Sequence, residues 1–302
     1  MTAPPIINGH IDSHDGEWNE TGAQSATGAR PRGAECVFPS AFSLNQFTRS
    51  TSDLSGADYA QRYDGGKKIL VIATDERYLA MANGTLFSTG NHPVETLLPM
   101  YHLHQAGFAF DIATPSGLMV KFEHWAMPCE DAAIQGLYQH YLPQFRRPRR
   151  LREVLSALTA GEQDYAGVFI PGGHGALIGL PFDADVAETI RWTMREDRYL
   201  IAICHGPAAF LSLALGENPL RGYALCAFPD SADRQTPAIG YMPGELPWFF
   251  GERLQAMGMT LVNTAISGQV HQDRKLLSGD SPFAANALGQ LAARTLLAQY
   301  GA

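Results

Sequence analysis

The stretch Arg198-Tyr-Leu-Ile-Ala-Ile-Cys-His-Gly-Pro-Ala-Ala-Phe210 joins a short apolar run to a helical pattern. Residues 199–203 are apolar or small, and the run is short enough for a buried β-strand. A Gly-Pro pair ends this strand, and the proline suits the first turn of the helix predicted over 208–215. Cys204 is therefore predicted to lie where a strand turns sharply into a helix, as the nucleophile does in a nucleophile elbow.

A thiol at this turn faces the N-terminal end of the following helix. The helix dipole lowers the pKa of a thiol placed there and favours the nucleophilic thiolate. His205 follows directly and is a candidate partner for Cys204. The alternative interpretation is a buried structural cysteine, because free cysteines are among the most buried residues. The local pattern by itself leaves both interpretations open.

Composition limits the classes of protein that the chain can belong to. The chain has 302 residues, enough for one large or two smaller domains, and 45% of them are hydrophobic. The net charge of −8 argues against non-specific binding to nucleic acid or an anionic membrane, which requires a basic face. No apolar run approaches the ~18 residues of a membrane span. The four cysteines lack metal-type spacing and no secretory signal is apparent, so we expect a reduced, cytoplasmic protein.

The chain divides into a short arm and one long domain. Residues 1–33 are rich in small and polar residues and are predicted to form a flexible N-terminal arm. Residues 34–302 are predicted to form a single α/β domain. Within it, residues 34–66 are expected to wrap over the main body as an extension, and residues 119–161 are expected to form an inserted, partly helical cap.

Apolar runs alternate with helical patterns through the rest of the domain. This alternation predicts a mostly parallel sheet sandwiched by helices. Ligands of such sheets bind beyond the carboxyl ends of the strands, where Gly172 and Gly173 follow one strand and can present backbone N–H donors to an oxyanion. Pro99 predicts a kink or an irregular first turn in its helix. The predicted strands are 68–73, 108–113, 166–170, 223–228, 260–263 and 275–278, and the predicted helices are 92–107, 183–196, 208–215, 249–258 and one ending at 300.

Six blocks in one order resemble a known family from about Phe38 to the C-terminus. They are FSTGNHPVETLLP (87–99), PGGHGALIGLP (171–181), CHGPAAF (204–210), FPDSAD (228–233), IGYMPG (239–244) and GDSPFAANALG (279–289). The chain resembles the ThiJ/PfpI superfamily, and within it the bacterial heat-shock chaperone branch, whose members are also described as glyoxalase III and as protein deglycases. The resemblance implies a flavodoxin-like fold similar to class I glutamine amidotransferases.

The resemblance also implies roles for particular residues. Cys204 would be the nucleophile, His205 its partner and Asp233 the third member that orients the imidazole, with Asp230 as the competing candidate. Glu95 matches the acidic residue that faces the thiol in this superfamily. A carboxyl beside a thiolate in a restricted pocket can hold a proton near neutral pH and pass it to substrate carbon. The alternative interpretation of Glu95 is a helix-start carboxylate stabilised by the dipole.

The implied reaction converts methylglyoxal to lactate through a hemithioacetal on Cys204, without nicotinamide or glutathione. The same pocket could release related adducts from amines or thiols, which is the activity described as deglycase. The resemblance also connects the chain with glycated protein clients, DNA repair and the stress response. The resemblance also implies a homodimer and a holdase chaperone for unfolded proteins, with Phe42, Phe47, Phe122 and Trp125 as candidate apolar surface. The alternatives are a chaperone without enzymatic activity and a cysteine peptidase or amidase that uses the same Cys-His-Asp set.

One departure from the family pattern concerns a metal site. Close relatives carry two histidines and a carboxylate near the pocket. His104 matches the first histidine and His140 approximately matches the second, but the acidic position is occupied by Ala109. Two imidazoles without a carboxylate make a poor zinc site. We therefore expect that the reaction requires no cofactor and that zinc binding, if present, is weak.

Overall fold

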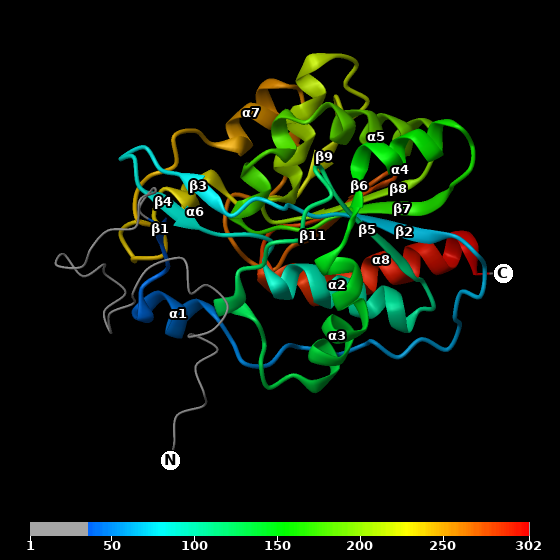
Figure 1. The fold of residues 1–302 in the computed structure, drawn as a ribbon, viewed down its shortest axis with the longest axis horizontal. Coiled ribbons are helices and arrows are strands. Elements are labelled where there is room, and N and C mark those ends of the chain that lie inside the picture. Colours follow the sequence, from blue (N-terminus) through cyan, green and yellow to red (C-terminus); the bar gives the residue numbers. More distant parts are fainter. Residues whose placement is uncertain (1–35, 302) are drawn as a thin grey trace.

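A seven-stranded sheet forms the middle of the computed structural model, which describes residues 36–301 (Figure 1). The strand order is β11-β12-β8-β7-β2-β5-β6, and only β11 runs antiparallel to its neighbour. The strands are β2 (Lys68–Ile72), β5 (Phe110–Thr114), β6 (Arg149–Arg150), β7 (Tyr165–Ile170), β8 (Tyr199–Ile203), β11 (Val270–Asp273) and β12 (Leu276–Gly279). The predicted α/β class with a mostly parallel sheet is confirmed.

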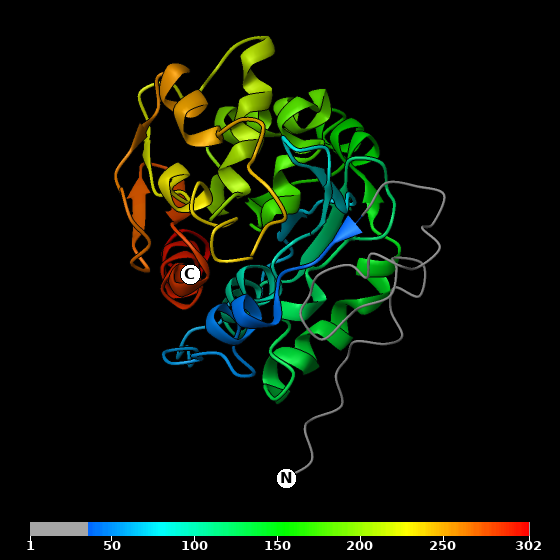
Figure 2. The same cartoon turned by 90° about the vertical axis from the view of Figure 1, so that its left-hand side faces the viewer.

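Helices cover both faces of this sheet (Figures 1 and 2). One layer contains α2 (Pro93–Gln105), α3 (Ala132–Arg146) and α8 (Ala285–Tyr300), and the other contains α4 (Leu151–Thr159), α5 (Ala184–Arg195) and α7 (Phe250–Ala256). Successive side chains of β2 alternate between the two layers, because Leu70 packs into one apolar core and Val71 into the other. This two-sided burial explains why the central strands appear as continuous apolar runs.

The smaller elements fall mostly between or beside these layers. A three-stranded sheet and a two-stranded sheet accompany the main one, in the orders β1-β4-β3 and β10-β9. These strands and the remaining α-helices are β1 (Cys36–Val37), β3 (Tyr78–Ala80), β4 (Leu86–Ser88), β9 (Ala224–Leu225), β10 (Thr260–Leu261), α1 (Ala41–Phe47) and α6 (Asp230–Asp233). The 3-10 helices are η1 (His124–Ala126), η2 (His174–Leu177), η3 (Leu180–Phe182), η4 (Gly206–Leu215) and η5 (Pro282–Ala284).

Several local expectations differ from the structure. The strands predicted at 223–228 and 260–263 shorten to β9 and β10 and pair with each other outside the main sheet. The helix predicted at 208–215 is the 3-10 helix η4, which begins at Gly206. Pro99 lies inside one continuous helix, α2, whose first residue is Pro93. Because proline has no N–H, Pro99 cannot donate the helical hydrogen bond to the carbonyl of Glu95.

The segment 119–161, expected to form an inserted cap, contributes to the body of the domain. Strand β6 pairs with β5 and so forms the edge of the main sheet. Apolar side chains of α3 and α4, including Phe145 and Leu151, are buried in the two cores. The two helices therefore belong to the two helical layers, since each buries an apolar stripe against the sheet.

The extension before β2 is fixed to distant parts of the chain. Ser43 Oγ in α1 donates a 2.6 Å hydrogen bond to the carbonyl oxygen of Ile239. Tyr59 Oη lies 2.8 Å from Nδ1 of His102 in α2. Ser43 and Tyr59 therefore fix the extension predicted over 34–66, which the structure describes from residue 36, to the main body. The arm predicted over 1–33 lies outside the described residues.

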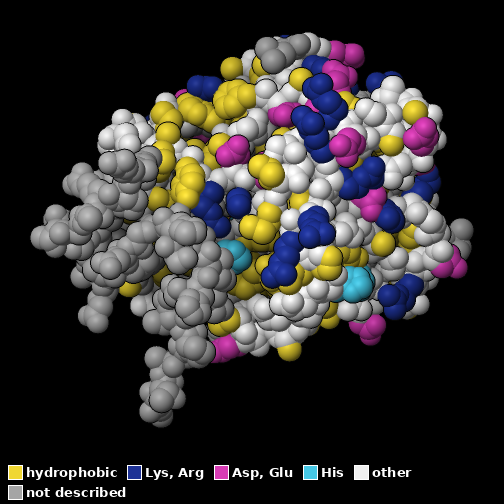
Figure 3. Space-filling view, in the orientation of Figure 1, with side chains coloured by type: hydrophobic (Ala, Val, Ile, Leu, Met, Phe, Trp, Pro, Cys, Tyr) yellow, Lys and Arg dark blue, Asp and Glu magenta, His cyan; other side chains and the backbone are white. Residues whose placement is uncertain are grey.

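Charged side chains of both signs are interspersed on the face seen in Figure 3. The picture agrees with the modest net charge of −8 and shows no extended basic stripe on this face. In the described part of the chain, no helix is both long and apolar enough to span a bilayer.

Candidate functional site at the carboxyl edge of the sheet

Cys204 follows directly after β8 and has a φ of +58°. This left-handed conformation is uncommon for a residue other than glycine and marks a strained turn. Gly206 has no Cβ, and a Cβ there would contact the carbonyl oxygen of Ile170 on β7. The side chain of Cys204 is only 3% exposed. The structure therefore places the thiol on a tight strand-to-helix elbow, in the interior of the site.

A chain of short contacts runs from the thiol to a buried carboxylate. Sγ of Cys204 lies 3.2 Å from Nδ1 of His205, and Nε2 of His205 lies 2.9 Å from Oδ2 of Asp233. The ring of His205 stacks on Phe228 with centroids 4.6 Å apart. An Nε2–H that donates to Asp233 leaves the lone pair of Nδ1 directed at sulfur. His205 is thus oriented to accept a proton from Cys204.

Asp230, the competing candidate for the third position, has a different set of contacts. Its two carboxylate oxygens accept the backbone N–H groups of Gly251 and Glu252, at 2.9 and 2.8 Å. Both N–H groups belong to the first turn of α7, where helical N–H groups lack partners within the helix. Asp230 therefore caps α7, and Asp233 contacts His205.

Asp233 also contacts a second imidazole that sequence reasoning did not single out. Oδ1 of Asp233 lies 2.9 Å from Nε2 of His174, and the rings of His174 and His205 lie 4.1 Å apart. Burial alone would raise the pKa of Asp233, but the two histidines hold it below its ordinary value. Asp233 is therefore a carboxylate shared by two imidazoles. In the sequence, the one signal for His174 is its position directly after Gly172 and Gly173 in the PGGHG block.

Asp233 and the two histidines that it contacts form the only cluster of three possible metal ligands in the described part of the chain. Their ligand atoms, from His174, His205 and Asp233, all lie within 4.8 Å of one another. Both Nε2 atoms already have Asp233 as a hydrogen-bond partner at 2.9 Å. A nitrogen that carries the donated proton has no lone pair for a metal. The cluster is therefore better described as a hydrogen-bonded acid–base set.

Glu95 is brought to the thiol by the first turn of α2. Its side chain is fully buried. A Cβ added to Gly172 would contact both Oε2 of Glu95 and Cβ of Cys204. The backbone N–H of Gly173 faces both the carboxylate and the thiolate and lowers both pKa values. Gly172 thus leaves space where the two side chains meet, and Gly173 supplies an N–H donor beside the reacting sulfur.

The net pKa shift of the thiol is opposite to the expected one. Burial raises the pKa of Cys204 well above its ordinary value, and the charges of Glu95 and Asp233 raise it further. Burial also raises the pKa of Glu95. The favourable dipole at the start of η4 does not offset this desolvation, because the thiol and the side chains around it are packed away from water. The resting pair therefore holds its protons, and His205 must accept the thiol proton when the substrate arrives.

Further polar groups surround this pair. Burial raises the pKa of Glu123 and lowers the pKa of His92 to about 3. Burial raises the pKa of Tyr241 well above its ordinary value, and the charges of Glu123, Glu95 and Cys204 raise it further. Sequence reasoning missed Glu123 and Tyr241, which come from loops far apart in the chain. No spacing in the sequence links them to Cys204.

The histidines proposed as metal ligands lie together but without a third ligand. The ring centroids of His104 and His140 are 5.5 Å apart. Burial lowers the pKa of His104, and the charges of His140 and Arg62 lower it further. No described Asp, Glu or Cys joins them in a three-ligand cluster. Ala109 removes the carboxylate, so these residues do not fit a zinc site of two histidines and one carboxylate.

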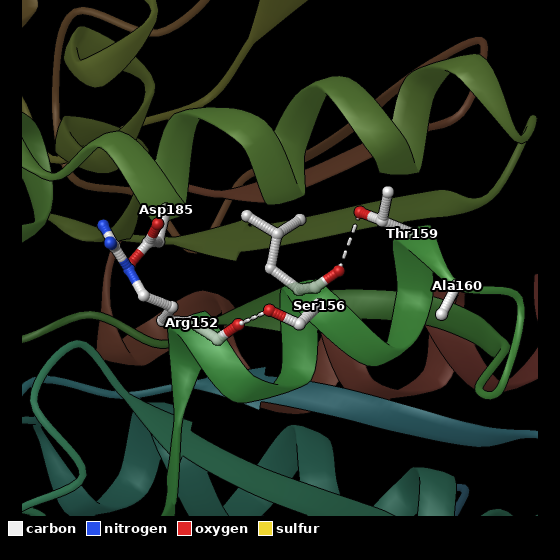
Figure 4. A pocket seen from close by; sticks show the side chains of 6 residues that line it. Arg152, Ser156, Thr159, Ala160 and Asp185 are labelled. Atoms are coloured by element: carbon white, nitrogen blue, oxygen red, sulfur yellow. Dashed lines mark hydrogen bonds and ion pairs between the residues drawn. The ribbon is translucent and has the colours of Figure 1, made fainter.

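A separate surface hollow lies between α4 and α5 (Figure 4). Nε of Arg152 lies 3.0 Å from Oδ2 of Asp185, so the two charges in the hollow pair with each other. The hydroxyls of Ser156 and Thr159 donate to backbone carbonyls of their own helix. The hollow contains no cysteine or unpaired charge, and none of the residues that line it belongs to the site around Cys204.

The fold and the site around Cys204 define an α/β protein that carries a buried cysteine on an elbow at the carboxyl edge of a parallel sheet. The chain belongs to the DJ-1/PfpI family, whose model matches residues 85–219. It is similar to protein/nucleic acid deglycase 1 and to protein/nucleic acid deglycase HchA of Escherichia coli K12 strains. Each is 60% identical over 263 residues, which cover 87% of this chain and 93% of the relative.

Solved structures support the fold assignment. The crystal structure of glyoxalase III from Candida albicans covers 78% of this chain and 97% of its own, with a TM-score of 0.57 and 20% identity. The Francisella tularensis rapid encystment protein of 24 kDa covers 76% of this chain and 99% of its own, with a TM-score of 0.63 and 19% identity. At 19% and 20% identity, these two structures support the assignment of the fold and not of the activity.

The contacts of Asp233 and Asp230 predict opposite results for matched substitutions. Asp233→Asn removes the charge that stabilises protonated His205, so turnover should fall on the order of a hundredfold. Asp230→Asn keeps an acceptor for the first turn of α7, so kcat should stay near wild type and stability should change by at most about 1 kcal/mol. Activity assays and thermal unfolding of both variants provide the measurement. A reversed ranking of the two variants would contradict the assignment.

Proposed function

We propose that the protein is a cofactor-independent glyoxalase III that also has deglycase activity. The observation that carries this proposal is the buried pair of Glu95 and Cys204, which face each other beside an N–H donor and an oriented histidine. A nucleophile and a proton-carrying carboxyl in one enclosed pocket suit an internal redox reaction of a small 2-oxoaldehyde. The names of the 60% identical relatives support the deglycase activity.

The proposed reaction begins at the aldehyde carbon of methylglyoxal. Sulfur of Cys204 bonds to this carbon, and the thiol proton passes through His205 to the aldehyde oxygen, which gives a hemithioacetal. Glu95 moves a proton from the former aldehyde carbon to its neighbour, so the first carbon is oxidised and the second is reduced. Water then cleaves the resulting thioester, sulfur regains its proton and lactate leaves. The electrons stay within the substrate, so no external oxidant or cofactor is needed.

Deglycase activity would use the same first step on glycated amines and thiols. The proposed substrates are early adducts of 2-oxoaldehydes on proteins or nucleic acids, which remain in equilibrium with the carbonyl compound. Cys204 is nearly fully buried, so a small adduct at the end of a flexible side chain fits the site better than an extended peptide. This burial argues against the cysteine peptidase alternative. We propose a cytoplasmic location, where thiols such as the four free cysteines stay reduced, and a homodimer as in the resemblance.

Glyoxalase activity in the absence of glutathione tests the proposal directly. Purified protein should convert methylglyoxal to lactate in a buffer without thiols, followed by enzymatic detection of lactate. Methylglyoxal consumption without lactate would indicate adduct formation only and would contradict the proposed reaction.

Removal of metal ions should leave this activity unchanged. The proposed steps use only protein side chains, and His104 and His140 lack a carboxylate partner. Protein dialysed against a strong chelator is expected to keep its kcat within about twofold, since each step here is acid–base or nucleophilic catalysis. Restoration of a lost rate by zinc alone, and not by magnesium, would overturn this expectation.

A second candidate function, holdase chaperone activity, is favoured by one exposed helix. Phe42 and Phe47 on α1 are 63% and 48% exposed, and exposed apolar side chains of this size suit contact with unfolded chains. The other two candidates for such a surface were wrong. Phe122 is buried in the core, and Trp125 is half-buried against Phe38 and Phe87.

The holdase activity should depend on α1 and not on the thiol. Replacing Phe42 and Phe47 by serine is expected to weaken suppression of client aggregation by at least about twofold, because binding of unfolded chains scales with apolar area. Cys204→Ala should keep the suppression. Light scattering of a heated client protein measures both. Equal loss in folded Cys204→Ala protein would indicate that the two activities have one origin.

A further inference from the structure

Two fully buried carboxyl groups in the pocket have oxygens without hydrogen-bond partners. Within the described chain, no hydrogen bond within the usual geometric limits reaches Oε2 of Glu123 or either oxygen of Glu95, although the Cys204 thiol and the Gly173 N–H lie close enough to Glu95 to lower its pKa. Leaving a buried polar atom unpaired costs about 1–3 kcal/mol, and more for a charged group. Natural proteins rarely keep such atoms unless ordered water, a ligand or a proton transfer uses them. The reaction proposed above assigns a task to Glu95 and none to Glu123.

One strip of backbone connects both carboxyls with the nucleophile. Gly172 lies against Glu95 and Cys204, and the N–H of Gly173 faces both. The next N–H, of His174, faces Glu123 and lowers its pKa. The N–H of Gly175 donates a 3.0 Å hydrogen bond to the carbonyl of Gly90, which follows Thr89 in the chain. Three consecutive residues of the loop after β7 therefore contact Glu95, Cys204 and Glu123 in turn. This places Glu123 in the same buried site as the thiol.

Glu123 is held in place through one of its oxygens only. The hydroxyl of Thr89 donates a 2.6 Å hydrogen bond to Oε1, and the backbone N–H of Glu123 donates a 3.0 Å hydrogen bond to the carbonyl of Asn91. Tyr241 lies near enough to lower the pKa of Glu123 but makes no hydrogen bond to Oε2. A carboxyl anchored at Oε1 and unpaired at Oε2 is arranged to interact with a bound molecule.

The two carboxyls also influence each other. Burial raises the pKa of both, and the charge of Glu123 raises the pKa of Glu95 further. Two carboxyls that repel each other in a dry pocket titrate as a pair, and one proton shared between them is the favoured state. Such a pair supplies one acid and one base at the same pH, which is the combination that an enediol reaction requires.

We propose that Glu123 is a second catalytic residue of the proposed glyoxalase reaction, moving protons on and off the substrate oxygens while Glu95 moves the proton between the carbons. The inference rests on the proposed function and divides its proton transfers between two side chains. It also narrows the substrate class. A productive substrate needs an oxygen on the carbon next to the thiol-bound carbon, so a simple aldehyde would form an adduct and react no further.

The proton transfers balance over one cycle. The carboxyl pair holds one proton, which lies on Glu95 in the resting site and on Glu123 once the hemithioacetal has formed. Ionised Glu95 then removes the hydrogen of the sulfur-bound carbon as a proton, and the C–H electron pair becomes the double bond of an enediol. The neighbouring ketone oxygen takes the proton of Glu123. Glu95 then returns its proton to the former ketone carbon, while Glu123 takes the hydroxyl proton of the sulfur-bound carbon as the thioester carbonyl forms. Both carboxyls regain their starting states.

Glu123→Gln tests this assignment, because the amide keeps the shape and the hydrogen bond from Thr89 but cannot supply the proton. We expect kcat to fall by on the order of a hundredfold, with KM and the iodoacetamide labelling rate of Cys204 within about twofold of wild type, since binding and thiol chemistry do not use this proton. Labelling is done in a Cys129→Ser background, because Cys129 is exposed and would react as well.

The pH profile separates a catalytic from a structural role. Glu123 must be protonated to act, so the wild-type kcat should fall on the alkaline side, and this alkaline fall should be absent in the residual activity of Glu123→Gln. A wild-type kcat in the variant, or a lowered kcat that keeps the alkaline fall, would overturn the proposal. Asp230→Asn, which changes a carboxyl outside the pocket, is the matched control and should keep the wild-type profile.

Thr89→Val provides a second test that does not depend on the folding of Glu123→Gln. It keeps the carboxyl and removes only the hydrogen bond that lowers its pKa, so the alkaline fall should move to higher pH. An unchanged profile would overturn the proposal. Lactate formation by wild type and Asp230→Asn is measured in parallel. Its absence would contradict the proposed function itself, whereas normal lactate formation with an unaffected Glu123→Gln would contradict only the role of Glu123.

Discussion

Replacing Cys204 by alanine is expected to abolish the conversion of methylglyoxal to lactate. Without sulfur no bond forms to the aldehyde carbon, and Glu95 then has no hemithioacetal on which to act. Loss of a covalent nucleophile removes the whole reaction path, so the residual rate should be that of the buffer. Alanine also removes little volume, so the variant should fold normally.

The matched control for this substitution is Cys226→Ala. Cys226 is buried like Cys204, and burial raises its pKa to about 12, but it lies on the segment that follows β9 and contacts Ser278. Both variants lose one buried thiol, and only Cys204→Ala should lose lactate formation. Lactate production by folded Cys204→Ala protein would contradict the assignment of the nucleophile and the function built on it.

Replacing Glu95 by glutamine is expected to lower turnover by on the order of a hundredfold or more, the scale of general acid–base catalysis. Glutamine keeps the size of the side chain but cannot carry a proton between the two carbons. The thiol should remain reactive, so iodoacetamide should still label Cys204 in the Cys129→Ser background. Near wild-type turnover would reassign Glu95 as a helix-start carboxylate.

The same substitution should make the protein more stable above neutral pH. Burial raises the folded-state pKa of Glu95 well above the value of about 4.5 in an unfolded chain. Between these two pKa values the folded state binds more protons than the unfolded state, so the stability of wild type falls as pH rises. Glutamine removes this dependence. Thermal unfolding should show Glu95→Gln more stable than wild type at pH 8 and closer to it at pH 4, and a constant difference would contradict the assigned pKa shift.

The Glu95 experiments also depend on a neighbour that the sequence did not reveal. If Glu123 carries the second proton, Glu95→Gln and Glu123→Gln should each lose most of kcat, and the double variant should lose little more than the worse single one. Residues that act as a unit show such non-additive effects. Additive losses would indicate two independent roles.

Local sequence pattern determined the type of fold and the strand-to-helix elbow that carries Cys204. The apolar runs of β2, β7 and β8 appear as strands because both of their faces are buried, and this burial depends on the strand's own residues. The elbow at Cys204 is likewise local, since a strand, a Gly-Pro pair and a helical pattern follow one another. The family resemblance added Glu95 and Asp233 to this local prediction.

Tertiary structure decided the features that depend on contacts between distant segments. It brings Asp233 to His205 and uses Asp230 as a cap, although both lie in one four-residue helix. It adds His174 and Glu123 to the pocket and buries Phe122. It also reverses the expected pKa shift of Cys204, because desolvation depends on everything packed around the thiol. The periodicity of apolar residues predicts whether a segment is a helix or a strand. Burial, charge pairing and pKa depend on contacts between segments that come together only after folding.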